Sequence, residues 1–403
     1  MQNAPIQTTN ADPCAVGTWS FEPRIDDGFY GDLGVMYSVA GSSTYAEEEF
    51  LPLIQYLRDG LNIPDGEMRA KRRKERQSQS IGANITNASY RPTPMDTRFA
   101  LVTQPHLCRT VLQPGLLFFD VVTVVNLDNI TSTTVETMKR EHNMTVEDER
   151  RISSTPNQEK RKADDNEDRF LSIESQNMTP QQQNMVDLHR AKAVKVLALS
   201  RHAPFKQTIY LDLDMVPCQK NFPHAMLRSA AKSSVDAGHF DIALPFASHP
   251  NVNLPMPPID KQQHYYRQNN QGNDAFDEMK EELGGRGINQ HNSAAVILNM
   301  TSSSTRELLR RFEDDFFSSS SPDLHSHLLT LDQPSLGRAM HAMFLENTDA
   351  SLRHVDLDPE RVCRKGSRYE RNKDQGLAEI SCGKTNNCIV IHKPVQLHII
   401  VGC

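Results

Sequence analysis

Short apolar runs alternate with longer amphipathic stretches along much of the chain. Residues 34–40 are apolar on both faces, as buried parallel strands are, and residues 47–61 follow with apolar side chains at helical spacing. Further strands are expected at 98–103, 116–125, 208–213, 241–245, 294–298 and 389–391, with helices at 182–200 and from Ser304 onward. This alternation predicts a three-layer α/β domain built on a mostly parallel central sheet.

Two polar stretches interrupt the alternation. Residues 64–96 contain a basic cluster at 69–76 that is typical of a solvated loop, and residues 128–180 have the composition of a disordered insertion. Residues 1–32 show no sustained periodicity. The predicted organisation is therefore an N-terminal tail or stem over 1–32 and a single domain over 33–403, with polar insertions at about 64–96 and 128–180.

Charge and hydropathy narrow the function classes. The net charge of −7 argues against general nucleic-acid binding, so no nucleic-acid partner is expected. No stretch approaches the ~18 consecutive apolar residues of a membrane span. The first thirty residues also lack the basic and apolar regions of a signal peptide. Either the protein is cytosolic, or a targeting segment or membrane tether lies outside this sequence.

The cysteines and the glycosylation sequons favour the secretory pathway, in the Golgi or ER lumen, over the cytoplasm. The chain has 7 cysteines, and the Cys382-to-Cys388 spacing suits a small disulfide loop. Zinc ligation and free thiols remain alternatives for the C-terminal cysteines. Sequons that would make the chain a glycoprotein occur at Asn84, Asn87, Asn129, Asn143, Asn177 and Asn299.

An acidic triplet carries the clearest candidate chemistry. The apolar run 208–211 leads into Asp212-Leu213-Asp214, at the strand end where open α/β sheets place their ligands. Side chains at i and i+2 of a strand share a face, so both carboxylates can approach one hard cation that bridges them to a diphosphate. The alternative is a strand-ending turn that carries two solvated carboxylates.

The surrounding segment 203–214, with the letters APFKQTIYLDLD, closely resembles the signature of nucleotide-diphospho-sugar transferases with the GT-A fold, including glycosyltransferase family 8 relatives. Similar landmarks follow in the same order at 241–244, 291–299, 332–336 and 389–394. The resemblance implies a glycosyltransferase with a GT-A type, Rossmann-like domain. Such an enzyme moves a sugar from a UDP-sugar or another nucleotide-sugar to a hydroxyl group of a glycan, protein or small-molecule acceptor, with retention of configuration in family 8.

The same resemblance assigns roles to individual residues. Metal binding falls to Asp212, Asp214 and His392, with Mn²⁺ expected and Mg²⁺ as the alternative. Contacts with the nucleotide-sugar fall to Asp212, Lys195, Lys393 and Ser293, and action at the reacting sugar falls to Asp332, Gln333 and Asn292. Each residue also has a structural alternative: a helical lysine is commonly a solvated charge, and an aspartate before a helix is commonly an N-cap.

Departures from the family pattern keep two other readings open. Ala294 stands where a glycine is expected, and Lys393-Pro394 follows His392 directly, which makes His398 a fallback ligand. Both features suit a catalytically inactive GT-A-fold carbohydrate-binding or scaffold protein. A haloacid-dehalogenase-type phosphatase also uses D-x-D, but on its first core strand and with a later acidic pair on a strand. Here the pair Asp314-Asp315 falls in an expected helix.

Overall fold

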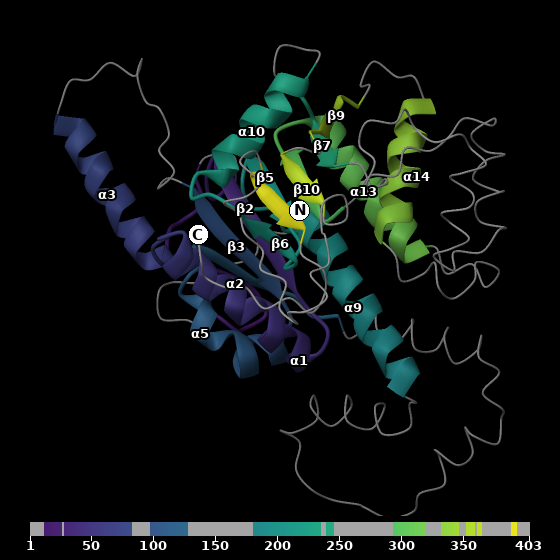
Figure 1. Ribbon diagram of the computed structural model, residues 1–403, viewed down its shortest axis with the longest axis horizontal. Coiled ribbons are helices and arrows are strands. Elements are labelled where there is room, and N and C mark those ends of the chain that lie inside the picture. Colours follow the sequence, from purple (N-terminus) through teal and green to yellow (C-terminus); the bar gives the residue numbers. More distant parts are fainter. Residues whose placement is uncertain are drawn as a thin grey trace, which may run out of the picture.

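The computed structural model describes residues 12–25, 28–82, 97–127, 180–234, 239–245, 293–318, 332–345, 352–358, 361–364 and 388–392. Within these ranges the chain forms an eight-stranded sheet of order β1-β4-β3-β2-β5-β8-β7-β9 and a three-stranded sheet of order β10-β11-β6 (Figure 1). The strands are β1 Gly17–Ser20, β2 Leu33–Val39, β3 Arg98–Thr103, β4 Val121–Val124, β5 Gln207–Leu211, β6 Met215–Pro217, β7 Ile242–Pro245, β8 Ala295–Asn299, β9 His354–Leu357, β10 Val362–Arg364 and β11 Val390–His392.

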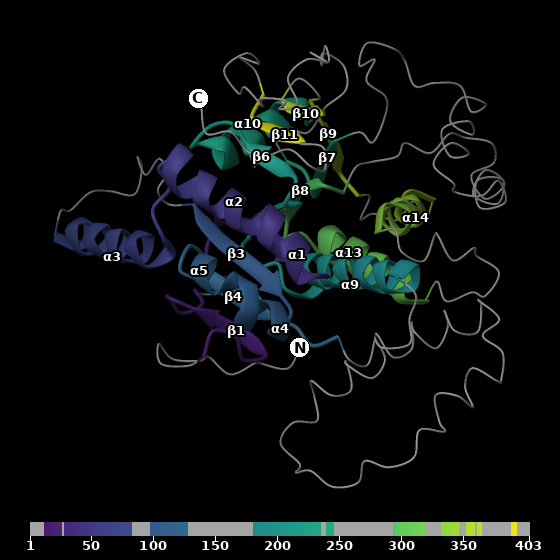
Figure 2. The same ribbon diagram turned by 60° about the horizontal axis from the view of Figure 1, so that its bottom comes forward.

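Helices cover both faces of the large sheet (Figure 2). They are α1 Ser43–Tyr45, η2 Ala46–Phe50, α2 Leu51–Gln55, η3 Tyr56–Gly60, α3 Gly66–Gly82, α4 Pro105–Leu107, η6 Cys108–Leu112, α5 Gln113–Leu116, α9 Pro180–Arg201, α10 Phe222–Ser233, α13 Ser303–Ser318 and α14 Asp332–Leu345. Among the described helices, none combines the length and apolar character that a membrane crossing requires.

Alternate residues of each central strand belong to two different hydrophobic cores. Val35 and Tyr37 of β2 pack in the core with α2 and α10, whereas Met36 packs in the core with α9, α13 and α14. This division follows from the two-residue period of a strand. Strand β2 pairs in parallel with β3 and β5, β3 with β4, and β7 with β9. The predicted three-layer α/β architecture with a mostly parallel sheet is confirmed.

The strand order has a switch point at β2. From β2 the chain moves to β3 and β4 on one side, and after α9 it returns to β5 on the other side. The helices that follow β2 and precede β5 lie on opposite faces of the sheet. Open α/β sheets bind ligands at such a switch point, outside the carboxyl ends of the strands. The ends of β2 and β5 therefore mark the expected position of a site.

One segment differs from the sequence-based expectation. The run 116–125 was predicted as one strand, but the helical stretch around α5 occupies its start and β4 begins only at Val121. Gly115 allows that turn to pack closely, because a Cβ atom there would lie 2.6 Å from the Phe50 ring. The insertion at 128–180 falls outside the described residues, apart from the first residue of α9.

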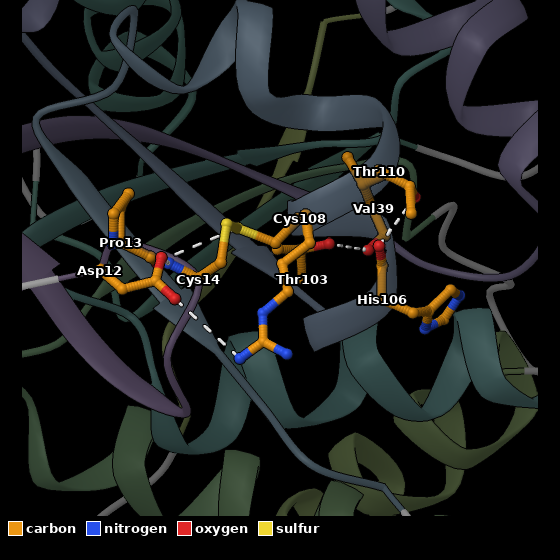
Figure 3. The surroundings of a disulfide bond; sticks show 9 residues. Asp12, Pro13, Cys14, Val39, Thr103, His106, Cys108 and Thr110 are labelled. Carbon is orange, nitrogen blue, oxygen red and sulfur yellow. Dashed lines mark hydrogen bonds and ion pairs between the residues drawn. A yellow bond between two sulfur atoms is a disulfide. The ribbon is translucent and has the colours of Figure 1, made fainter. Parts of the chain in front are cut away.

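The N-terminal segment, expected to be a tail or stem, contributes to the sheet. Strand β1 pairs antiparallel with β4, and the hydroxyl groups of Thr18 and Thr123 lie 3.2 Å apart in a hydrogen bond. A disulfide joins Cys14 to Cys108 across a sequence separation of 94 residues, next to the hydrogen bond from Thr103 to Val39 (Figure 3). Sequence alone does not give disulfide connectivity, which is why this pairing was not foreseen.

One of the C-terminal cysteines takes part in a disulfide, as expected. Cys388 is disulfide-bonded, and its partner lies outside the side chains that the structure describes. The pairing of Cys388 with Cys382 therefore stays a prediction. Cys218 is not joined to either of the cysteines Cys14 and Cys108. With two of the described cysteines joined to each other and a third also bonded, the zinc alternative has no support from the described cysteines.

The basic cluster at 69–76 forms part of helix α3 and not a solvated loop. Arg69 is 1% exposed; its side chain donates to Asp120 Oδ2 from Nε at 3.1 Å and from Nη2 at 2.6 Å. Arg73 donates to Asp120 Oδ1 at 2.5 Å and to Glu22 Oε2 at 2.9 Å, and Arg98 also pairs with Glu22. We call these five side chains the α3 ion cluster. It fixes the base of a helix that extends away from the body of the protein (Figure 1).

Removing the Cys14–Cys108 disulfide should lower stability substantially. A Cys14→Ala/Cys108→Ala variant frees a loop of 94 residues in the unfolded chain, and disulfides that close loops of this kind contribute about 2–5 kcal/mol. Thermal unfolding followed by circular dichroism should show a melting temperature at least several degrees lower. Cys218→Ala, which removes a cysteine outside this disulfide, is the matched control and should change the melting temperature less. Equal melting temperatures for the double variant and the wild type would contradict this.

Asp120 should be the most sensitive residue of the α3 ion cluster. Asp120→Asn leaves Arg69 and Arg73 buried without their shared counter-charge, so the free energy of unfolding should fall by about 3–5 kcal/mol. Asp65→Asn is the matched control, because the Arg58–Asp65 pair is about one-third exposed and should contribute about 1 kcal/mol or less. Urea unfolding measures both. Similar losses in the two variants would rule out the anchoring role.

Candidate active site

A buried lysine connects four elements at the switch point. Lys195 of α9 is 2% exposed, and its ammonium group lies 2.9 Å from Asp212 Oδ2, 2.9 Å from Asp332 Oδ2 and 3.1 Å from Ser293 Oγ. These partners follow β5, begin α14 and precede β8. An ammonium group has three N–H bonds, so all three are used. Lys195 is therefore a buried structural charge and not the solvated surface lysine that its helical position allows.

A hydrogen-bonded chain holds the first aspartate of the acidic triplet. The Tyr210 hydroxyl donates to Asp212 Oδ1 at 2.8 Å and lies 2.7 Å from Ser38 Oγ, near the end of β2. Because the phenol has a single proton, Ser38 is the donor in the second bond. The Asp212 carboxylate thus has one oxygen on Tyr210 and the other on Lys195. Its side chain is still 24% exposed, and each oxygen keeps a further lone pair for a ligand.

The carboxylate of Asp332 is enclosed. Its Oδ1 lies 3.0 Å from the Lys192 ammonium group, and its Oδ2 accepts from Lys195 and, at 2.5 Å, from Ser293 Oγ. Burial alone raises the pKa of this carboxyl, but the charges of Lys192 and Lys195 outweigh that effect and hold the pKa far below its usual range. Asp332 is consequently an ionised anchor at the first residue of α14.

The second aspartate lies in the turn that joins β5 to β6. The backbone N–H of Met215 donates to the Asp212 carbonyl, which closes this turn and leaves Asp214 half-buried. Tyr45, 41% exposed at the end of α1, lies near both aspartates: desolvation raises the pKa of its hydroxyl, and the charges of Asp214 and Asp212 raise it further. Tyr45 is thus an exposed side chain next to the partly buried carboxylates of Asp212 and Asp214.

Several residues assigned by resemblance are placed only in part. His392 lies in β11, where its backbone pairs with Met215, directly after the acidic triplet. Gln333 is half-buried in the first turn of α14. Asn292, Lys393 and His398 lie outside the described residues. The strand register brings the backbone of His392 beside the triplet, and the metal-ligand role of its side chain stays a prediction.

The donor atoms suit a hard divalent cation in kind. Asp212 and Asp214 offer carboxylate oxygens, which Mn²⁺ and Mg²⁺ accept. Across the described ranges, no group of three or more histidine, cysteine, aspartate or glutamate side chains is arranged to hold a metal. The backbone of His392, the third ligand expected from the sequence, pairs with Met215 beside the triplet, and its side chain lies outside the described ones.

Two features that favoured other functions have structural explanations. Ala294 is 4% exposed and packs in the core, while its carbonyl accepts from the Asp212 N–H at 2.8 Å. Its methyl group is therefore enclosed in the core. The two carboxylates of the acidic pair on α13 have other partners: Asp315 joins this helix to Arg338 of α14 at 2.6 Å, whereas Asp314 forms an exposed pair with Arg310 of the same helix. Neither carboxylate belongs to the network around Lys195.

Four residues of the site were not identified as functional from the sequence: Ser38, Tyr45, Lys192 and Tyr210. Two of them carried a usable signal. Lys192 precedes Lys195 by three residues and so shares its helix face, and Tyr210 precedes Asp212 by two residues and so shares its strand face. Ser38 and Tyr45 reach the site only because β2 pairs with β5.

Comparisons with known proteins give distant likenesses. No known protein family and no curated protein matches the sequence. Among solved structures, the chain is similar to mouse xyloside xylosyltransferase 1, with 11% identity, 92% of this chain and 100% of that chain covered, and a TM-score of 0.39. It is similar to the bifunctional glycosyltransferase WbbM, with 11% identity, coverage of 94% and 48%, and a TM-score of 0.37. It is also similar to an active-site mutant of LgtC, with 8% identity, 90% of this chain and 87% of that chain covered, and a TM-score of 0.34.

TM-scores and identities this low carry no argument about the function of this chain. The functional case therefore rests on the chain's own residues and their arrangement.

The Ser38–Tyr210–Asp212 chain should behave as one coupled unit. Tyr210→Phe removes two buried hydrogen bonds and should lower the free energy of unfolding by about 1–3 kcal/mol, and Ser38→Ala should cost about 0.5–1.5 kcal/mol. The double variant should cost clearly less than the sum, because Ser38 reaches Asp212 only through the phenol. Urea unfolding of the four proteins gives the coupling. If the two losses of unfolding free energy were strictly additive, the hydrogen bonds between Ser38, Tyr210 and Asp212 would not be coupled.

Proposed function

We propose that this protein is a glycosyltransferase that moves a sugar from a nucleoside-diphosphate sugar to an acceptor hydroxyl group. The observation that carries the proposal is the Lys195-centred network of Asp212, Ser293 and Asp332 at the switch point of the sheet. It joins four elements whose sequences resemble successive motifs of one family. A strand-ending turn with solvated carboxylates would need no such buried partner.

The residues suit a donor that carries a diphosphate. Asp212 and Asp214 would hold a divalent cation, with Mn²⁺ expected and His392 as the third ligand. When bound, the cation would neutralise the negative charge of the diphosphate leaving group. Lys195 and Tyr210 fix the Asp212 carboxylate, so this metal-binding group would already be oriented when the donor binds. Retention of anomeric configuration, as in family 8, is part of the proposal.

The remaining sequence-based roles belong to the same proposal. Asn292 and Gln333 would contact the sugar near the reacting carbon, and Lys393 would meet the diphosphate. Ser293 is bonded to both Lys195 and Asp332, so its role would be to support the donor pocket. The acceptor would be a glycan, a protein or a small molecule with a free hydroxyl group.

The disulfides support a location in the lumen of the secretory pathway. Cys14 and Cys108 are bonded to each other and Cys388 is also bonded, and such bonds persist in oxidising compartments. We therefore include the Golgi or ER lumen in the proposal. A nucleotide-sugar as donor is compatible with either compartment and does not decide the question.

An inactive carbohydrate-binding protein is the second candidate. Its support was the methyl group of Ala294, which is enclosed in the core, and the Lys393-Pro394 spacing after His392, which lies outside the described residues. A phosphatase would require Asp212 as a nucleophile. That role fits poorly with a carboxylate held by Tyr210 and Lys195.

A donor screen tests the function directly. The purified protein with Mn²⁺ should release nucleoside diphosphate from one or more nucleotide-sugars, and Asp214→Ala should lower that rate at least a hundredfold because it removes a metal ligand. Asp314→Ala is the matched control, since this carboxylate lies on α13 in an exposed pair with Arg310. The coupled assay reads the rate, and circular dichroism verifies the fold of both variants.

Three outcomes separate the candidates. Binding of a nucleotide-sugar without release of the diphosphate, with or without acceptors, would favour the inactive protein. Hydrolysis of phosphomonoesters that depends on Asp212 would favour the phosphatase. Failure to bind any nucleotide-sugar at millimolar concentration, with and without metal, would eliminate the transferase.

A further inference from the structure

Two lysines on one face of α9 share the carboxylate of Asp332 but differ in exposure. Lys195 is 3% exposed at its side chain, and its three N–H bonds are used within the protein. Lys192, one turn earlier, is 25% exposed. Within the described part of the chain, Asp332 Oδ1 at 3.0 Å is the one oxygen paired with the Lys192 ammonium group. Two of its N–H bonds therefore remain for a ligand or water.

Asp332 has no surface to offer a ligand. Its side chain is 2% exposed, and its two oxygens are taken by Lys192, Lys195 and Ser293. A sugar could reach this carboxylate only by breaking a buried ion pair, which is costly in a low-dielectric site. The arrangement makes Asp332 the group that positions both lysines and leaves Lys192 as the cation on the open side.

The net charge of the site indicates a role for Lys192. Asp212, Asp214 and Asp332 contribute three negative charges and the two lysines contribute two positive charges, which leaves one net negative charge. A diphosphate would be repelled by this set unless cations face it directly. A divalent ion at the aspartates would supply one such cation, and within the described part of the chain Lys192 is a partly exposed cation of the protein beside them. Burial lowers the pKa of Lys192, but the charges of Asp332 and Asp212 raise it by more, so the group stays protonated.

We propose that Lys192 is a donor-contacting residue whose ammonium group binds a phosphate oxygen of the nucleoside diphosphate, and that Asp332 is its positioning residue. The inference rests on the proposed function and reassigns two roles within it. Asp332, expected to act at the sugar, holds the lysines. Lys195, expected at the nucleotide-sugar, holds Asp212 and is closed to the ligand.

The test measures binding and not turnover. The probe is whichever of UDP, GDP and ADP raises the melting temperature of the wild-type protein most in the presence of Mn²⁺, together with the matching nucleoside. Isothermal titration compares the wild type with Lys192→Met, Lys192→Arg and Lys74→Met. The last variant is the matched control, because Lys74 is an exposed lysine on α3, away from α9 (Figure 1).

Lys192→Met should weaken binding of the diphosphate about ten- to a hundredfold, the range of a charge-assisted hydrogen bond, and leave nucleoside binding unchanged. Lys192→Arg should restore most of the loss, and Lys74→Met should have no effect. Asp332→Asn should weaken diphosphate binding as well. It should also lower the melting temperature, because it removes the negative charge that Lys192 and Lys195 share.

The contrary outcomes are distinct. If the wild type binds a diphosphate and Lys192→Met binds it equally well, the role of Lys192 is refuted and the proposed function stands. An equal loss of nucleoside and diphosphate would mean a general disturbance of the pocket and would also refute the phosphate contact. If the wild type binds none of the three diphosphates, both the proposed function and this inference fail.

Discussion

The ion pairs of Lys195 are the constraint on which the rest of the site depends. An ammonium group that is 2% exposed is tolerated only when every N–H has an oxygen partner, because an unpaired buried charge is very costly. The partners come from the end of β5, the segment before β8 and the start of α14. These elements must therefore be in place together, so that folding of this edge of the sheet also assembles the site.

A second buried ionic cluster shows what distinguishes a site from an anchor. In the α3 ion cluster, Asp120 is 3% exposed and is enclosed by two arginines. In the cluster around Lys195, Asp212 and Lys192 are each about one-quarter exposed. Buried ion pairs thus fix helix α3 in the first cluster. At the carboxyl ends of β2 and β5, similar ion pairs hold two charged groups that stay partly exposed.

The sequence predicted those elements whose signal is local. Strands buried on both faces have continuous apolar runs, so β3 was expected at the residues where it lies, and β2, β5, β7 and β8 within one or two residues. The acidic triplet at the end of β5 was also recognised. Strand β1, the Cys14–Cys108 disulfide and the burial of Arg69 were missed because each depends on a partner far away in the sequence. Helix α3 was not predicted, because its cluster of basic residues is typical of a solvated loop.

The same distinction applies within the site. Asp212, Lys195, Ser293 and Asp332 were proposed from motif order, and the structure brings these four together. The exposure of each side chain could not be predicted, because it depends on how α9 packs on β2 and β3 and where α14 begins. That geometry separates Lys192 from Lys195, two lysines that the sequence presents as equivalent neighbours on one helix face.

The most direct test of the account is a crystal structure of the protein soaked with Mn²⁺ and the nucleoside diphosphate that it binds best, with anomalous data collected for the metal. The account predicts an anomalous peak within coordination distance of the carboxylates of Asp212 and Asp214. It also predicts diphosphate density against this ion and the Lys192 ammonium group. A fully ligated metal and nucleotide elsewhere on the protein, with the Asp212–Asp214 turn unoccupied, would contradict it.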